Sequence, residues 1–236
     1  MMPKLWERLL VSSYASQHRP YTRRNITNIS SKNAAVRELE VERKFALTPS
    51  SLAYLKSKDA CSKFDSYMHL GRKSTHDIYF DRNGTLMSKG LYVRRRDGLW
   101  EAKVRVGGDF INSSFREIND VDSIRKEITK YSVGVGINRA IEEMLCPCAD
   151  FVTERESWMI NGFKIDVDTT DFGHTVGEVE LTKYLSTEDG TAREQELILV
   201  MDTEIETFMK FYPQVFLVGE PLGKLSAYFK QIHNKT

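Results

Sequence analysis

The chain has 236 residues and a formal net charge of +1, with 41% hydrophobic and 28% charged residues. This composition is typical of a folded globular protein and excludes a disordered or fibrous chain. The balanced charge argues against a protein that coats nucleic acid, and no apolar run approaches the roughly 20 residues needed to cross a bilayer. We therefore expect one sizeable domain, or two small ones, with neither nucleic acid nor membrane as partner.

The first 37 residues are rich in basic and small polar side chains. They contain seven Lys or Arg residues against one acid, Glu7. This bias resembles a mitochondrial transit peptide, and a disordered basic tail or an upstream start codon outside the working protein are the alternatives. The cysteines, Cys61, Cys146 and Cys148, have neither zinc nor disulfide spacing and indicate a reducing compartment. We expect an intracellular protein, cytoplasmic or mitochondrial, with a basic extension over residues 1–37 and one folded domain over residues 38–236.

A strand and a short helix open the folded domain. Apolar residues alternate with charged ones from Glu38 to Leu47, and this period of two residues predicts a β-strand. Thr48 followed by Pro49 predicts the start of a helix, with Thr48 as its N-cap.

Seven more strands and four more helices are expected along the chain. The strands fall at residues 75–81, 91–96, 99–106, 114–119, 151–160, 164–169 and 175–181. The helices fall at residues 121–131, 138–146, 192–212 and 224–233. Asn161-Gly162 and Asp97-Gly98 are typical of two-residue hairpin turns. This order predicts an α+β fold built on an antiparallel sheet.

Charged side chains occupy one face of several predicted strands. The pairs are Glu40 and Glu42, Arg94 and Arg96, Asp166 and Asp168, and Glu178 and Glu180. Residues two apart in a strand project to the same side, which is usually the solvent side of a half-buried strand. Here, however, acids of poor β-propensity occupy strand centres, and the signs of charge are separated by strand. A closed barrel would direct these side chains into its lumen, with helices covering its apolar outer face.

A lumen crowded with charges is costly to form unless a ligand completes the pairing. Arg and Lys bind phosphate oxygens, and paired carboxylates hold hard cations such as Mg²⁺ or Mn²⁺. The pattern therefore points to a polyphosphate bound together with divalent cations.

Several short motifs, in a fixed order, resemble the CYTH family, the triphosphate tunnel metalloenzymes. They are Glu40-Val41-Glu42-Arg43-Lys44, Asp77–Asp81, Leu91–Arg96, Trp100–Lys103, Phe151–Arg155, Asp166–Asp168, Gly177–Glu180 and finally Lys224. The first pentapeptide alone would be a weak match, and the order and spacing of the set make the resemblance specific. The run from Asp166 to Gly173 into Val176–Glu180 is similar to the animal thiamine triphosphatase branch of that family.

The resemblance implies an eight-stranded antiparallel tunnel, open at both ends. It also implies hydrolysis of thiamine triphosphate to thiamine diphosphate and phosphate with Mg²⁺, or with Mn²⁺, as cofactor. The residues it assigns to the metal are Glu40, Glu42, Asp166, Asp168 and Glu180. Those it assigns to the substrate are Lys44, Arg94, Arg96, Lys103, Arg155, Glu178 and Lys224. We expect a monomer that acts on this small-molecule triphosphate.

Three residues carry finer expectations. The resemblance predicts an aromatic residue, usually Trp, two places before Arg94, where it would stack on the thiazolium ring. Tyr92 occupies that place and would stack more weakly than Trp, or would serve only in packing. Lys103 and Tyr79 are expected beside the attacked phosphorus, where they would deprotonate or orient water. Crowding by Arg94 and Arg96 predicts a lowered pKa for Lys103, and simple phosphate binding is its alternative role.

Other functions of the same tunnel are also open. They are hydrolysis of inorganic tripolyphosphate or of a nucleoside triphosphate, adenylate cyclisation, and polyphosphate binding without turnover. No base-recognition element supports cyclisation, and the complete set of acids and cations argues against a binding module. His76 is the only histidine expected near the site, and Glu117 is expected in a structural ion pair.

Overall fold

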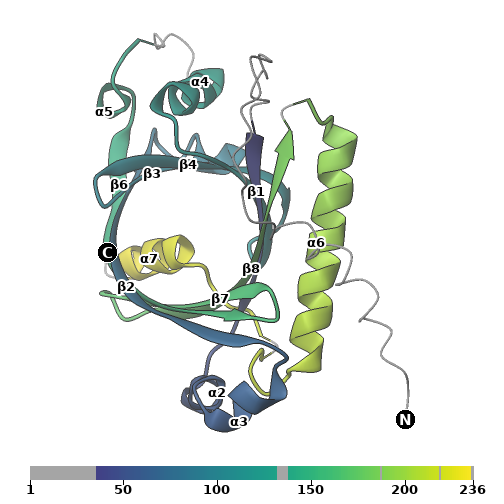
Figure 1. Ribbon diagram of the computed structural model, residues 1–236. Coiled ribbons are helices and arrows are strands. Elements are labelled where there is room, and N and C mark those ends of the chain that lie inside the picture. The colour runs from purple at the N-terminus through teal and green to yellow at the C-terminus, as the bar shows by residue number, and fades with distance from the viewer. Residues whose placement is uncertain (1–35, 132–137, 187, 218, 235–236) are drawn as a thin grey trace, which may run out of the picture. The chain divides into compact units, whose positions relative to one another are not determined.

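Eight antiparallel strands form a closed ring in the computed structural model, which describes residues 36–131, 138–186, 188–217 and 219–234 (Figure 1). The strands are β1 (Val36–Phe45), β2 (Tyr67–Asp81), β3 (Leu91–Arg96), β4 (Leu99–Gly108), β5 (Asn112–Ile118), β6 (Cys146–Ile160), β7 (Phe163–Thr170) and β8 (Thr175–Ser186). They follow one another around the ring as β1-β5-β4-β3-β2-β6-β7-β8, and β8 pairs again with β1. The predicted antiparallel barrel is confirmed. Residues 1–35 of the predicted basic extension lie outside the described residues.

The helices are α2 (Pro49–Leu55), α3 (Lys58–Lys63), α4 (Val121–Tyr131), α5 (Ile141–Met144), α6 (Thr191–Phe211) and α7 (Lys224–His233), with a 3₁₀ turn at Met87–Lys89. Helix α2 begins as predicted, because the Thr48 hydroxyl accepts a hydrogen bond from the Ser51 N–H at 3.1 Å and Pro49 takes the first helical position. None of the described helices combines the length and apolar character of a membrane-spanning segment.

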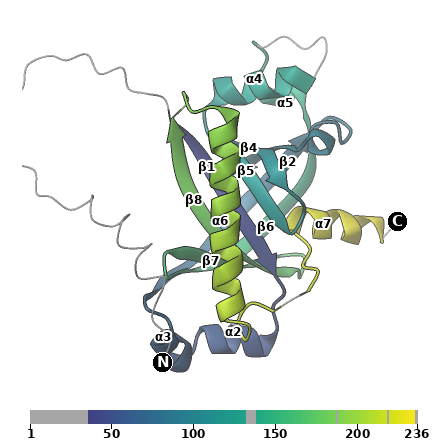
Figure 2. The same cartoon turned by 90° about the vertical axis from the view of Figure 1, so that its right-hand side faces the viewer.

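Two hydrophobic cores lie between the outer face of the ring and the helices. On one side, Val41 of β1 belongs to the core that includes Met201 and Ile205 of α6. Elsewhere, Val93 of β3 shares a core with Ile128 of α4. Figure 2 shows α6 running along the outside of β1 and β8. Because side chains alternate along a strand, this apolar packing outside turns the charged faces of the same strands inward.

Both predicted two-residue hairpins are present. Asn161 and Gly162 join β6 to β7 with φ values of 51° and 85°, and Asp97 and Gly98 join β3 to β4 with φ values of 49° and 88°. Two successive residues in the left-handed region are the mark of a turn whose twist matches the flanking strands.

Helix α7 differs from the other helices in its position. It lies at one end of the ring instead of on the outer face (Figures 1 and 2). Its side chains Leu225, Tyr228 and Phe229 pack against a cluster that contains Tyr79 of β2 and Phe151 of β6. The expected tunnel is therefore lined at this end by a helix as well as by strands.

Several predicted elements are wrong in extent. Strand β6 begins at Cys146 instead of residue 151, and β8 ends at Ser186 instead of residue 181. The helix expected over residues 138–146 is confined to α5, and Cys146 already begins β6. Pro147 accounts for this, because the residue before a proline is driven to extended conformations. Strand β2 starts at Tyr67 instead of residue 75, since its early residues are mostly exposed and show no apolar alternation. They form a strand by pairing with β6, from Tyr67 opposite Ile160 onward.

Candidate active site

The lumen encloses a cavity of about 550 Å³ with a densely charged wall. The cations on this wall are Lys44, Arg94, Arg96, Lys103, Arg105, Arg155, Lys164 and Lys224. The carboxylates on it are Glu38, Glu40, Glu42, Glu101, Glu117, Glu178 and Glu180. Asp77, Asp166 and Asp168 lie fully buried behind the wall and pair with its cations. The charged faces predicted from sequence thus point into one cavity, where the three buried aspartates together with the carboxylates of the wall outnumber the cations.

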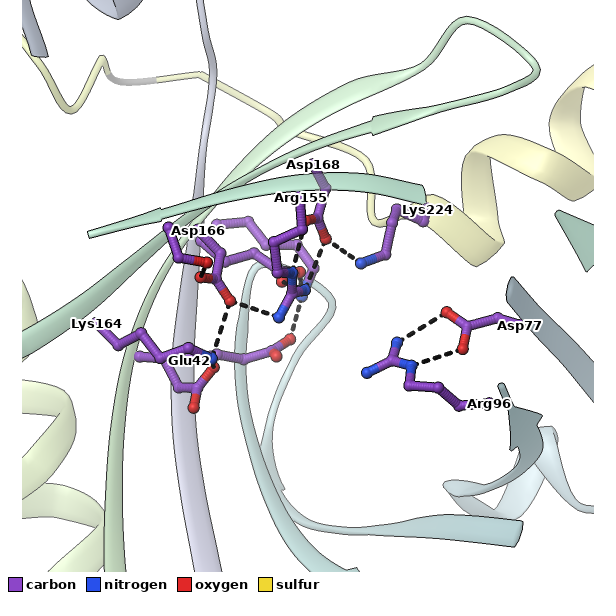
Figure 3. Close-up of polar contacts among 12 residues, drawn as sticks. Glu42, Asp77, Arg96, Arg155, Lys164, Asp166, Asp168 and Lys224 are labelled. Carbon is purple, nitrogen blue, oxygen red and sulfur yellow. Dashed lines mark hydrogen bonds and ion pairs between the residues drawn. The ribbon is translucent and has the colours of Figure 1, made fainter. Parts of the chain in front are cut away.

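Arg155 anchors one side of the cavity. From β6 it reaches the neighbouring strand β7, where it makes two 2.7 Å hydrogen bonds to Asp168 and lies 2.5 Å from Asp166 (Figure 3). Lys224, the first residue of α7, also donates to Asp168. Burial alone would raise the pKa of Asp168, but the positive charges of Lys224 and Arg155 outweigh it and hold that pKa well below its usual range. Asp168 therefore remains ionised and ties α7 to the barrel.

Two arginines of β3 form a second anchored group. Arg96 makes a bidentate pair with Asp77, with both N–O distances at 2.7 Å (Figure 3). Arg94 contacts Glu101 at 2.7 Å and also donates to the hydroxyl of Tyr79 at 3.4 Å. Because each carboxylate occupies only part of a five-donor guanidinium, the remaining N–H groups are free to meet phosphate oxygens in the cavity.

Lys103 lines the cavity, and the prediction of a lowered pKa for it is wrong. Its ammonium group lies 2.5 Å from Glu40 and 2.8 Å from Glu117. Burial lowers the pKa of Lys103, but the charges of Glu40 and then Glu117 outweigh burial and raise that pKa far above its ordinary value. Arg94 opposes this effect only weakly. The raised pKa favours the protonated form of Lys103 and argues against its predicted role as a base. The predicted ion pair of Glu117 is present and contributes to the shift.

Three carboxylates gather where β1 meets β8. Glu42 and Glu180 stand directly opposite each other across these strands, and Glu40 follows two residues before Glu42. Burial, and then the negative charge of Glu40, raise the pKa of Glu180 to about 7. The raised pKa means that Lys164, 3.1 Å away, does not fully neutralise the cluster.

Such oxygen donors have the chemistry that a hard divalent cation prefers. No three acidic, histidine or cysteine side chains of the described residues are already arranged to hold one. The reason is that lysines stand among the acids: Lys44 pairs with Glu42, and Lys164 lies 3.0 Å from Asp166. The donor set therefore fits a divalent metal once these ion pairs are exchanged.

All the residues predicted to contact substrate line the cavity: Lys44, Tyr79, Tyr92, Arg94, Arg96, Lys103, Arg155, Glu178 and Lys224. Of the predicted metal ligands, Glu40, Glu42 and Glu180 line it, whereas Asp166 and Asp168 are completely buried beneath Arg155 and its neighbours.

Sequence reasoning missed Arg105, Lys164, Glu38 and Glu101 as cavity residues. The signal was available, because Arg105 follows Lys103 by two residues and Lys164 precedes Asp166 by two. His76 does not face the cavity, since its ring is exposed and lies 2.6 Å from Asp150.

Comparison with known proteins gives one family. The CYTH domain model matches residues 38–208. The chain is 27% identical to a human thiamine-triphosphatase over 176 residues, which are 66% of this chain and 74% of that protein. It is 28% identical to the thiamine-triphosphatase of Macaca fascicularis over 161 residues, 60% of this chain and 67% of the relative. Among solved structures, the PH1819 protein of Pyrococcus horikoshii OT3 is similar with a TM-score of 0.48 and 15% identity, covering 81% of this chain and 99% of that one.

Proposed function

The chain belongs to the CYTH domain family, and we propose that it hydrolyses thiamine triphosphate to thiamine diphosphate and phosphate in its lumen, with Mg²⁺ or Mn²⁺ as cofactor. The family match and the two thiamine-triphosphatase relatives support a triphosphatase-type activity. The observation that carries the proposal is the wall of the cavity, where anchored cations alternate with carboxylates around one closed space. The thiamine part of the substrate rests on the relatives and on the aromatic side chain of Tyr92.

The cations are suited to hold the triphosphate. Arg94, Arg96 and Arg155 reach the cavity from β3 and β6 and are each fixed by a carboxylate, so they lose little freedom when a phosphate binds. Lys103 and Lys224 add charge from β4 and from α7. Phosphoryl transfer depends mainly on positioning and on neutralising the charge of the transferred group, which is what this set provides.

The acids are suited to hold the metal. Glu40, Glu42 and Glu180 would be its ligands at the junction of β1 and β8, and Asp166 and Asp168 would support them from β7. When bound, a divalent cation neutralises phosphate charge and lowers the pKa of coordinated water. The excess of carboxylates over cations in the lumen is reduced by the same binding.

The reaction transfers the terminal phosphoryl group to water. The water oxygen forms a bond to the terminal phosphorus, the bond from that phosphorus to the bridging oxygen breaks, and the diphosphate keeps the bridging oxygen. The proton lost by water leaves through the carboxylates of the cavity wall. Lys103 is assigned to phosphate binding, because Glu40 and Glu117 raise its pKa and so favour the protonated form. Tyr79, hydrogen-bonded to Arg94, is assigned to positioning water or that arginine.

One assay tests the proposal. Phosphate release is measured from thiamine triphosphate, inorganic tripolyphosphate and ATP, side by side, with Mg²⁺ and with Mn²⁺, and EDTA serves as the control. We expect metal-dependent release, fastest from thiamine triphosphate. Faster release from tripolyphosphate would overturn the assignment of thiamine triphosphate as substrate. No release from any of the three compounds would overturn the proposed hydrolase activity.

A further inference from the structure

Arg105 differs from every other cation on the wall of the cavity, because it has no carboxylate partner. Within the described residues, each of the other seven cations lies within 4.0 Å of at least one carboxylate, and Arg105 lies within that distance of none. Its hydrogen bonds go to neutral oxygens only. These are the main-chain carbonyl of Asp109, the hydroxyl of Tyr92 at 3.1 Å and the hydroxyl of Ser113 at 3.4 Å. Arg105 therefore makes no direct ion pair among the described residues, although its charge helps to lower the pKa of the nearby Asp109 carboxylate.

Three aromatic rings surround this guanidinium and form an aromatic box, defined here as Tyr92, Phe110 and Phe115. The guanidinium carbon lies 5.8 Å from the centre of the Tyr92 ring and 5.2 Å from those of Phe110 and Phe115. Tyr92 and Phe115 also meet edge to face, with ring centres 5.9 Å apart. Cations within about 6 Å of an aromatic face are attracted to it. Phe115 also has the Lys103 ammonium 5.4 Å from its ring centre, whereas Arg105 is the cation found at Tyr92 and Phe110 among the described residues.

The turn between β4 and β5 holds the box in shape. Gly108 has a φ of 76°, and a side chain there would meet the Asn112 carbonyl oxygen at 1.9 Å. The Asp109 carboxylate accepts hydrogen bonds from the backbone N–H groups of Asn112 and Ile111, each at 2.7 Å. These hydrogen bonds lower the pKa of Asp109. These bonds order the backbone of the turn that carries Phe110, whose side chain is 70% exposed.

Tyr92 matches Arg105 chemically. Its phenolic oxygen accepts a hydrogen bond from the guanidinium, whereas the indole of a tryptophan offers a donor and no acceptor. A tyrosine at this position therefore holds Arg105 against the box more firmly than a tryptophan would. Tyr92 therefore contacts Arg105 both through its ring face and through its hydroxyl group.

We propose that Arg105 is a specificity-determining residue that reduces, without reversing, the preference of the site for a triphosphate with a cationic head group over one that ends in an anionic group. A thiazolium ring and a guanidinium compete for the same ring faces and repel each other. An anionic end, as in inorganic tripolyphosphate, instead supplies the charge partner that Arg105 lacks. This inference rests on the proposed function and refines it: thiamine triphosphate binds only by displacing Arg105 from the box.

The test compares two ligands in the full-length protein with Mg²⁺. Calorimetry gives the Kd of pyrophosphate and of thiamine diphosphate, and steady-state assays give kcat/KM for tripolyphosphate and thiamine triphosphate. The two quantities compared are the ratio of the Kd values and the ratio of the kcat/KM values for the thiamine compound and its inorganic counterpart. In Arg105→Gln we expect both ratios to shift toward the thiamine compound by about tenfold. The neutral side chain leaves the ring faces to the thiazolium, and it no longer pairs with an anionic end. Arg105→Met, which keeps the stem that packs on the rings, is a second neutral variant in case the first does not fold.

Arg95→Gln is the matched control. Arg95 also stacks on two rings, 5.9 Å from the centres of Phe80 and Trp100, but these rings belong to the core outside the barrel. Its replacement should leave both ratios unchanged. Ratios that stay within twofold of wild type in folded Arg105 variants, or that shift toward the anionic ligand, overturn the inference alone. A wild-type protein that binds neither ligand overturns the proposed function, and this inference with it.

Discussion

Lys103 of β4 bridges Glu40 of β1 and Glu117 of β5 with N–O distances of 2.5 and 2.8 Å. The three strands β1, β5 and β4 are consecutive neighbours in the sheet, so the bridge forms only when β5 pairs with both of the others. It favours the charged form of the lysine, because the two carboxylates raise the pKa of Lys103 far above its ordinary value. Its contribution to catalysis is then that of a fixed positive charge.

Replacing Lys103 by Met should reduce kcat/KM for the triphosphate substrate by roughly 10- to 100-fold, the range for losing one charged hydrogen bond. Because the lysine does not act as base, the pH–rate profile of the variant should keep the basic limb of the wild type. The measurement is kcat/KM between pH 6 and pH 10. Lys103→Arg, which keeps the charge, should recover part of the loss, and a basic limb that disappears in Lys103→Met would restore the lysine as the base.

Replacing Glu42 by Gln should weaken Mg²⁺ binding, because it removes one oxygen charge from the three-carboxylate cluster at β1 and β8. Isothermal titration with Mg²⁺ in the absence of substrate should show an affinity lower by roughly tenfold or more. Glu194→Gln is the control, since Glu194 is equally buried but pairs with Arg37 outside the lumen. Equal Mg²⁺ affinities in the wild type, Glu42→Gln and Glu194→Gln would show that Glu42 is not a ligand of the metal.

Replacing Asp168 by Asn should destabilise the fold by about 3–5 kcal/mol at pH 7, because Lys224 and Arg155 lose the charge that balances them. The pKa of Asp168 is lowered in the folded state, so its contribution is complete above its unfolded pKa of about 3.9 and is lost as the pH falls below that value. Urea unfolding between pH 7 and pH 3 should show the difference between wild type and variant shrinking below about pH 4. A difference that is constant with pH would mean that packing, not charge, is lost.

Replacing Gly177 by Ala should destabilise the protein, although this residue is in a strand and has no positive φ. A methyl group on Gly177 would lie 2.2 Å from the ring of Phe45, on the paired strand β1. Overpacking of this kind costs about 1–3 kcal/mol, measured as a loss in the free energy of unfolding. Phe45→Leu, which shortens the obstructing ring, should be destabilising alone but less so together with Gly177→Ala. Additive losses in the double variant would exclude the clash as the cause.

Much of the fold could be read from periodicity. Strand β3 and helices α4 and α7 match their predicted bounds, because each has clear alternation or a clear apolar stripe next to a turn signal. The first half of β2 could not be read in this way. Its side chains are mostly exposed, and the hydrogen bonds that define it come from β6, which is far away in sequence.

For the candidate site, the sequence was informative about which residues belong to it but not about their protonation states. Its members could be found because alternating charges on strands of a barrel must share one lumen. The direction of the pKa shift of Lys103 could not be predicted from the sequence. Sequence neighbours suggested that Arg94 and Arg96 control Lys103, whereas Glu40 and Glu117 do so from other strands.

The amino-acid sequence by itself determined which side of each strand is charged, since a period of two depends only on the local backbone. Together with the resemblance to the CYTH family, this pattern predicted the barrel, a polyphosphate ligand and most of the residues of the cavity wall. Only the tertiary structure decided which acid meets which base, that α7 brings Lys224 to Asp168, and that Arg105 fills an aromatic box without an acidic partner among the described residues. Electrostatic energies vary with distance and burial, and neither quantity is encoded in the spacing of residues along a chain.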